Sequence, residues 1–237
     1  MISFILAVRN EEKALPRTLE SLTGYKGPHE IIVADDHSAD GTVAAARRYT
    51  DKVVENTGER FTIAANRNAG AALAQGDIFV FADADSYVRD ADDFFEKVEA
   101  MFRDDSRLGA VTFFNRFTPD LETRKDRLFL AYFNNVAWLI NLAGFGTCTG
   151  RIQAMRADTF RKLNGYNPAI VASEDVELFR RMAKAGKTRS ARSLTVYHSG
   201  RRQHALGWAR VIWIWTVNSA AALFFKKAYS KEWQEVR

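Results

Sequence analysis

Cysteine is nearly absent from this chain of 237 residues, with Cys148 as its single representative. A lone cysteine excludes an intrachain disulfide and a zinc site built from several cysteines. The start of the chain also lacks an apolar run as long as a signal peptide requires. Residues 1–8 are apolar but have no basic segment before them and end at Arg9, so we expect a buried strand and no signal peptide. These features predict a cytoplasmic protein.

Positive charge is in only modest excess, since 34 Lys and Arg against 29 Asp and Glu give a net charge of +5. This surplus suits phosphate-bearing ligands or an anionic membrane surface. It is too small to indicate nucleic acid, and the usual nucleic-acid motifs are missing, so we expect no nucleic-acid partner. The length accommodates one large α/β domain with a substantial core.

Short apolar strands alternate with helical patterns through the first half of the chain. We expect strands at residues 2–8, 30–34, 52–55 and 78–82, and helices at residues 15–22, 42–49 and 63–74. Such alternation indicates a parallel sheet with crossover helices. The second half is less regular, with helices expected at residues 92–102, 125–142, 158–163 and 176–185 and strands at residues 109–114 and 193–197.

Two pairs of carboxylates directly follow predicted strands. Asp83 and Asp85 flank Ala84 after the fourth strand, and Asp35 and Asp36 end the second. Ligands of open α/β sheets bind beyond the carboxyl ends of the strands, so both pairs are expected at one site. Asp83 and Asp85 suit Mg²⁺ or Mn²⁺ together with substrate phosphates, whereas Asp35 and Asp36 suit ribose or base. Capped turns remain the alternative for both pairs.

A third acidic pair, Glu174 and Asp175, opens a predicted helix. A carboxylate there is a candidate base that takes a proton from an attacking hydroxyl. The alternative is stabilisation of the helix dipole. Arg67 is a candidate for gripping a phosphate or a nucleobase, or a solvated helix residue. His198, after the last predicted strand, is a candidate metal or diphosphate contact or a structural histidine.

In combination, these segments resemble the family 2 glycosyltransferases. The resemblance extends to about Trp208 and rests on ordered motifs at residues 3–11, 31–42 (IIVADDHSADGT), 66–70, 76–85 (GDIFVFADAD), 165–167 and 174–178. It implies the GT-A fold, a Rossmann-like, mostly parallel sheet flanked by helices, with a C-terminal helical extension. His37 stands where the family usually has glycine, and Arg9 where an aromatic residue is frequent.

The resemblance implies an inverting transfer of a sugar from a nucleotide-diphosphate sugar, with UDP-sugars favoured, to the hydroxyl of a sugar or lipid-linked acceptor. Asp36 would bind base or ribose beside Asp35, and Asp83 would contact ribose. Asp85 would ligate Mn²⁺ or Mg²⁺. Asp175 would be the general base, with Glu174 helping to position acceptor or base.

We expect a catalytic domain over residues 1–207, with a donor half (1–110) and an acceptor half (111–207), and an extension over residues 208–237. The extension contains an apolar stretch, residues 211–225, that is shorter than a membrane-spanning helix requires. A peripheral contact with the inner face of the cell membrane is one interpretation of this stretch and of the aromatic-rich residues 129–142. Core packing or a homodimer contact is the other.

Two other functions stay open. A nucleotidyltransferase has a comparable core and metal site, but it would have a glycine-rich, basic first loop, and residues 9–12 contain no glycine and two acids. A nucleotide-sugar-binding protein without turnover would lack the base or the metal ligand, and both Asp85 and Asp175 are present.

Overall fold

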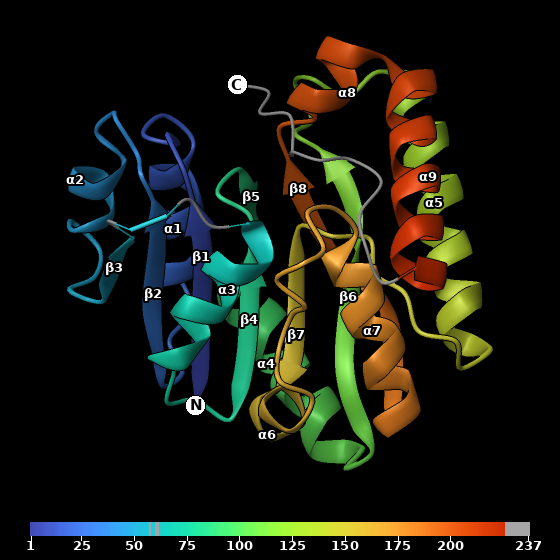
Figure 1. Cartoon of the computed structure of the whole chain (residues 1–237), viewed down its shortest axis with the longest axis horizontal. Coiled ribbons are helices and arrows are strands. Elements are labelled where there is room, and N and C mark those ends of the chain that lie inside the picture. Colours follow the sequence, from blue (N-terminus) through green and yellow to red (C-terminus); the bar gives the residue numbers. More distant parts are fainter. Residues whose placement is uncertain (57, 60–61, 226–237) are drawn as a thin grey trace.

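The computed structural model describes residues 1–56, 58–59 and 62–225, which form one eight-stranded sheet with helices on both faces (Figure 1). The strands are β1 (Ile2–Val8), β2 (His29–Asp36), β3 (Val53–Asn56), β4 (Ile78–Ala82), β5 (Ser86–Tyr87), β6 (Leu108–Phe117), β7 (Ile152–Arg156) and β8 (Lys187–His198). Their spatial order is β3-β2-β1-β4-β7-β6-β8-β5. The expected strand–helix alternation is therefore confirmed, and the sheet matches the predicted GT-A architecture.

Six strands, β1 to β4, β6 and β8, point the same way and end at the same edge of the sheet. β1 is parallel to β2 and β4, β6 is parallel to β8, and β7 runs antiparallel between β4 and β6. The carboxyl ends of β1, β2, β4, β6 and β8 therefore lie together. The sheet brings the segments after residues 8, 36, 82, 117 and 198 to one place.

Alternating side chains of the central strands bury the two faces under different helices. Phe4 and Leu6 of β1 pack with α1 (Leu15–Thr23) and α4 (Ala91–Asp104). Ile5, between them, faces the opposite cluster with α3 (Ile63–Ala72), α6 (Ala157–Lys162) and α7 (Glu174–Ala185). This two-faced burial explains why the parallel strands are continuous apolar runs. The short α2 (Thr42–Ala46) follows β2.

The helices of the C-terminal part pack beside the sheet. α5 (Arg124–Leu142) and α9 (Trp208–Phe225) lie side by side at the right of Figure 1, and α8 (Arg201–Leu206) precedes α9 at the top. Trp208 joins them, since its ring stacks on Phe129 at 4.8 Å and its Nε1 donates to Asp126 at 2.6 Å. α8 and α9 follow the last strand, in agreement with the C-terminal helices expected from the sequence. Across the described residues, no helix combines the length and apolarity needed to cross a bilayer.

Candidate functional site

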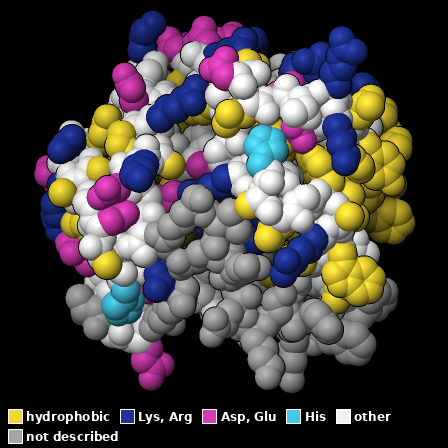
Figure 2. All heavy atoms as spheres, turned by 90° about the horizontal axis from the view of Figure 1, so that it is seen from above, with side chains coloured by type: hydrophobic (Ala, Val, Ile, Leu, Met, Phe, Trp, Pro, Cys, Tyr) yellow, Lys and Arg dark blue, Asp and Glu magenta, His cyan; other side chains and the backbone are white. Residues whose placement is uncertain are grey.

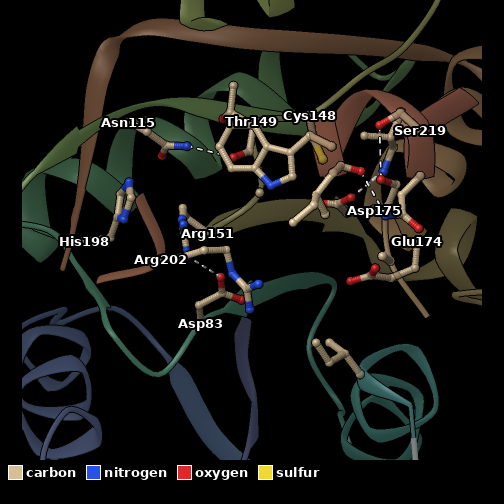
Figure 3. A pocket seen from close by; sticks show the side chains of 18 of the residues that line it. Asp83, Asn115, Cys148, Thr149, Arg151, Glu174, Asp175, His198, Arg202 and Ser219 are labelled. Atoms are coloured by element: carbon tan, nitrogen blue, oxygen red, sulfur yellow. Dashed lines mark hydrogen bonds and ion pairs between the residues drawn. The ribbon is translucent and has the colours of Figure 1, made fainter. Parts of the chain in front are cut away.

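A cavity of about 840 Å³ opens at the shared carboxyl edge of the sheet. Asp36, Asp83, Asp85, Glu174 and Asp175 all line it. The structure thus brings a residue of each of the three acidic pairs to one site, although Asp35 is not among the residues that line the cavity. The volume is in the range of small-ligand sites. Figure 3 shows Glu174 and Asp175 on one side of this cavity and Asp83 with Arg151 and Arg202 on another.

The loop after β2 fixes the first acidic pair. Asp35 Oδ2 accepts the Ser38 N–H at 3.0 Å, so this carboxylate shapes the turn. Asp36 Oδ1 accepts Asn56 Nδ2 at 2.9 Å and lines the cavity. His37, which follows Asp36, has φ of +58°, the left-handed backbone region that favours glycine. The glycine usual at this position in the resembled family suits that conformation.

Asp83 and Asp85 follow β4 and meet Arg151 across the cavity. Arg151 Nη1 lies 3.4 Å from Asp83 Oδ2 and 3.8 Å from Asp85 Oδ1. The Ser199 hydroxyl donates to Asp85 as well. Burial disfavours the ionised Asp85, yet Arg151 and the Ser199 hydroxyl hold its pKa below the usual value. Asp85 is therefore a buried anion at the centre of a basic surround.

Arg67 reaches from α3 to two carboxylates. Its Nη1 donates to Glu174 Oε1 and its Nη2 to Asp83 Oδ1, both at 2.8 Å. Burial, and then the neighbouring Asp175, raise the pKa of Glu174 to about 7. Through these two hydrogen bonds, the Arg67 guanidinium connects Asp83, after the end of β4, to Glu174 at the start of α7.

The start of α7 holds its two acids differently. Ser173 precedes them with φ of +66°, a strained value for a residue other than glycine. Glu174 is buried against Arg67, whereas Asp175 is half-buried and lines the cavity. Asp175 Oδ1 accepts the Val176 N–H at 2.8 Å. Both residues line the cavity, and Asp175 is the more exposed member of the pair.

For a divalent cation, the described residues offer a carboxylate ligand at this site and not a complete set of protein ligands. Among residues 1–56, 58–59 and 62–225, no group of three His, Cys, Asp or Glu is placed to hold a metal. Asp85 fits the alternative in which one carboxylate and substrate phosphates bind the ion. His198 is buried beside it, and burial and Arg151 depress its pKa well below the usual range. The neutral ring accepts the Gly200 N–H at Nδ1 (3.2 Å), which places its proton on Nε2.

Several basic residues of the site were not singled out from the sequence. Arg151 has φ of +68° and directly follows Gly150 at the entry to β7. Arg201 pairs with Glu11, with Nη1 2.9 Å from Oε2, and its Nε lies 3.6 Å from Asp85. Arg202 also lines the cavity. The sequence signal for Arg151 is slight, a Gly-Arg pair before an unpredicted strand.

Comparison with known proteins assigns the chain to a family. The model of glycosyl transferase family 2 matches residues 3–164, and the chain belongs to this family. It is 39% identical over 94 residues to the 4,4'-diaponeurosporenoate glycosyltransferase of Staphylococcus haemolyticus and 32% identical over 95 residues to the poly(ribitol-phosphate) beta-glucosyltransferase of Bacillus spizizenii. These matches cover 35% and 37% of this chain but only 24% and 15% of the two relatives.

Solved structures share the fold over most of the chain. The mannosyltransferase PcManGT from Pyrobaculum calidifontis, in complex with GDP-Man and Mn²⁺, superposes with a TM-score of 0.75 at 20% identity, covering 95% of this chain and 63% of that one. Residues 1–349 of TarS from S. aureus with UDP-GlcNAc give 0.63 at 17% identity, covering 84% and 58%. At such identities the comparison establishes the GT-A fold alone.

Proposed function

We propose that this protein is an inverting glycosyltransferase that moves a sugar from a nucleotide-diphosphate sugar to an acceptor hydroxyl. One observation carries the proposal: Asp175 lines the same cavity as Asp36, Asp83 and Asp85 at the carboxyl edge of the sheet. The family and its named relatives support glycosyl transfer. The bound GDP-Man and UDP-GlcNAc of two structural neighbours support a nucleotide-sugar donor.

In this proposal the nucleoside lies along the ends of β2 and β4. Asp36 accepts hydrogen bonds from base or ribose, supported by Asp35 in its turn, and Asp83 accepts from ribose. Arg151 and Arg202 offer positive charge to the diphosphate, which Arg guanidinium groups bind well. We favour a UDP-sugar. Arg67 is predicted to act on the donor through Asp83, because both of its pairing arms are engaged by carboxylates.

Asp85 is the proposed ligand for Mn²⁺ or Mg²⁺, a use of metal supported by the Mn²⁺ bound to PcManGT. When bound there, such an ion would supply positive charge to the departing diphosphate. A ligand role for His198 requires its ring to release the Gly200 N–H and present a deprotonated nitrogen.

Transfer then needs a base at the acceptor. Asp175 accepts the proton of the acceptor hydroxyl while its oxygen bonds to the anomeric carbon and the bond to the nucleoside diphosphate breaks on the opposite face. Single displacement inverts the anomeric configuration. Glu174, held by Arg67, positions Asp175. The acceptor is a sugar or a lipid-linked molecule.

A thermal-shift screen of UDP, GDP, dTDP and CDP, each with and without Mn²⁺, tests donor binding. A nucleotide at 100 times its Kd adds about 2.7 kcal/mol of stability. A shift with triphosphates alone, and release of pyrophosphate, would instead indicate a nucleotidyltransferase. Slow hydrolysis of the donor to nucleoside diphosphate supports the transferase.

The base is tested separately with Asp175→Asn. This variant should keep the nucleotide shift but slow transfer by roughly 10²–10⁴-fold, the usual contribution of a positioned base. Normal transfer in Asp175→Asn would remove Asp175 from the mechanism, whereas loss of the nucleotide shift would show that the substitution disturbs the donor half.

A further inference from the structure

The cavity has two halves of opposite chemistry. The half at the strand ends carries the carboxylates and arginines described above. The other half lies between α5 and α9 and is lined by apolar side chains from both helices: Leu130, Phe133, Val136, Ala137, Ile140, Ile214 and Trp215. Phe133 and Trp215 meet edge to face at 5.7 Å. One end of the cavity therefore suits phosphates, and the other suits hydrocarbon.

Three polar side chains of α5 and α9 near the apolar half are hydrogen-bonded to backbone groups. On α9, Thr216 Oγ1 donates to Ile212 O at 2.8 Å, and Asn218 Nδ2 donates to Ile214 O at 2.9 Å. On α5, the Asn134 amide exchanges two hydrogen bonds with the backbone of Asn115. A sugar acceptor needs several convergent hydrogen-bonding groups. The hydrogen-bonding groups named here are instead engaged within the protein.

The two halves meet at Asp175. Ser173, two residues earlier, lies with its Oγ 3.1 Å from Ser219 Oγ, which brings α9 to the start of α7. On the other side, a Cβ at Gly150 would lie 3.4 Å from Asp175 Oδ2. Figure 3 shows Asp175 close to Glu174, Cys148 and Ser219. A hydroxyl held beside Asp175 can thus belong to a molecule whose remaining length lies between α5 and α9.

The same two helices also carry apolar side chains to the surface. Tyr132 and Leu142 of α5 are 63% and 70% exposed, and Trp213 of α9 is 67% exposed. Figure 2 shows hydrophobic side chains gathered at the right edge of the molecule, where Figure 1 places α5 and α9. Arg192 lies over Trp138 at 4.6 Å, so positive charge borders this surface. An apolar surface next to an apolar cavity provides a route for a chain that leaves a lipid phase.

We propose that the half of the cavity between α5 and α9 binds a hydroxyl-bearing lipid, with its hydroxyl at Asp175 and its hydrocarbon chain against Phe133, Ile140 and Ile214. The inference rests on the proposed glycosyl transfer and names its acceptor class. Burial of each methylene in such a site strengthens binding about fourfold. A hydrocarbon chain of a few methylenes thus gains affinity from the apolar walls, whereas a sugar gains little from them.

The probes for the test are 1-hexanol, 1-octanol and 1-decanol, titrated into the full chain below their solubility limits by calorimetry. Affinity should rise about fourfold per methylene in the wild type. Ile140→Gln, which puts an amide without partners into the apolar half, should weaken 1-decanol binding roughly tenfold. The matched control Leu73→Gln changes a leucine of comparable character on the surface, 49% exposed and outside the cavity, and should bind as the wild type does.

A flat chain-length series would overturn the proposal, and so would 1-decanol binding that is equal in Ile140→Gln and the wild type. The series needs only the wild type, so a folding defect of the variant cannot decide it. The nucleotide melting shift distinguishes the two proposals. If alkanols fail but a nucleoside diphosphate still stabilises the protein, the lipid acceptor is wrong and donor binding stands. If the nucleotides fail, the proposed transfer falls, whatever the alkanols do.

Discussion

Arg67→Met should destabilise the protein strongly and in a pH-dependent way. The Arg67 side chain is 6% exposed and its partner Glu174 is 8% exposed, so this pair is shielded from water. Asp83, the second partner, is 30% exposed and better solvated. Methionine keeps the length of the stem but leaves Glu174 as a buried carboxylate without its cation. Removing one partner of a buried pair costs roughly 3–5 kcal/mol.

The pKa of Glu174 sets the conditions for the assay. This pKa is raised to about 7, so Glu174 is largely ionised at pH 8 and protonated at pH 5. A raised native pKa contributes stability that is complete below the unfolded value and is lost as pH rises through about 7. In Arg67→Met the pKa of Glu174 should rise further, because the charge of Arg67 no longer lowers it, so the cost should be larger at pH 8 than at pH 5 by about 1.4 kcal/mol, the free energy of the one pH unit above 7.

Urea unfolding at the two pH values measures the free energy, and the melting temperature should fall by about 2–4 °C per kcal/mol. The control is Arg47→Met, which removes an exposed ion pair with Glu55 and should cost under about 1 kcal/mol. Measured against Glu174→Gln alone, Arg67→Met in the Glu174→Gln background should cost the same at both pH values, because the titrating carboxylate is gone. A loss of the same size at both pH values would show that packing of Arg67, and not charge, stabilises the site.

Two further predictions concern other carboxylates. Asp85→Asn should weaken UDP binding in the presence of Mn²⁺ but not in its absence, since an amide is a poor ligand for a hard cation; calorimetry that gives the same metal dependence would reject Asp85 as a ligand. For Asp126, burial alone raises the pKa, but hydrogen bonds from Thr123 and Trp208 outweigh it and lower the pKa to about 2. Its stabilisation should be lost as pH falls from about 4 to 2, and Asp126→Asn should lack this part of the acid transition in urea unfolding.

Local sequence pattern predicts the strands of the first half well. The bounds expected for β1 and β4 coincide with those in the structure, because each is an apolar run with clear breaks on both sides. β7 was not predicted. Its second residue, Gln153, interrupts the apolar pattern, yet this residue is fully buried and accepts from the Tyr166 hydroxyl at 3.2 Å. Only the fold provides that partner, so the pattern of the segment alone understates its burial.

The residues of the site also divide into those whose meeting the sequence predicts and those whose meeting it does not. Carboxylates at strand ends could be expected to meet, because parallel strands end at one edge. Arg151 could not, since it reaches Asp83 from 68 residues away through the antiparallel strand that was missed. The apolar half of the cavity could likewise not be predicted from the sequence. Aromatic residues of α5 suggested burial or a membrane surface, but periodicity does not say which distant helix they contact.

The position of the proposed base depends on contacts between segments that are far apart in the chain. Glu174 is held by Arg67, 107 residues away, and Ser173 meets Ser219, 46 residues away. Asp175 itself has its local hydrogen bond to the start of α7, so its position follows that of the helix end. A displacement of α3 or α9 therefore moves the proposed base without touching it. Since a misplacement of about 1 Å can cost roughly 10²-fold in rate, residues of α9 should influence transfer even where they contact neither donor nor acceptor.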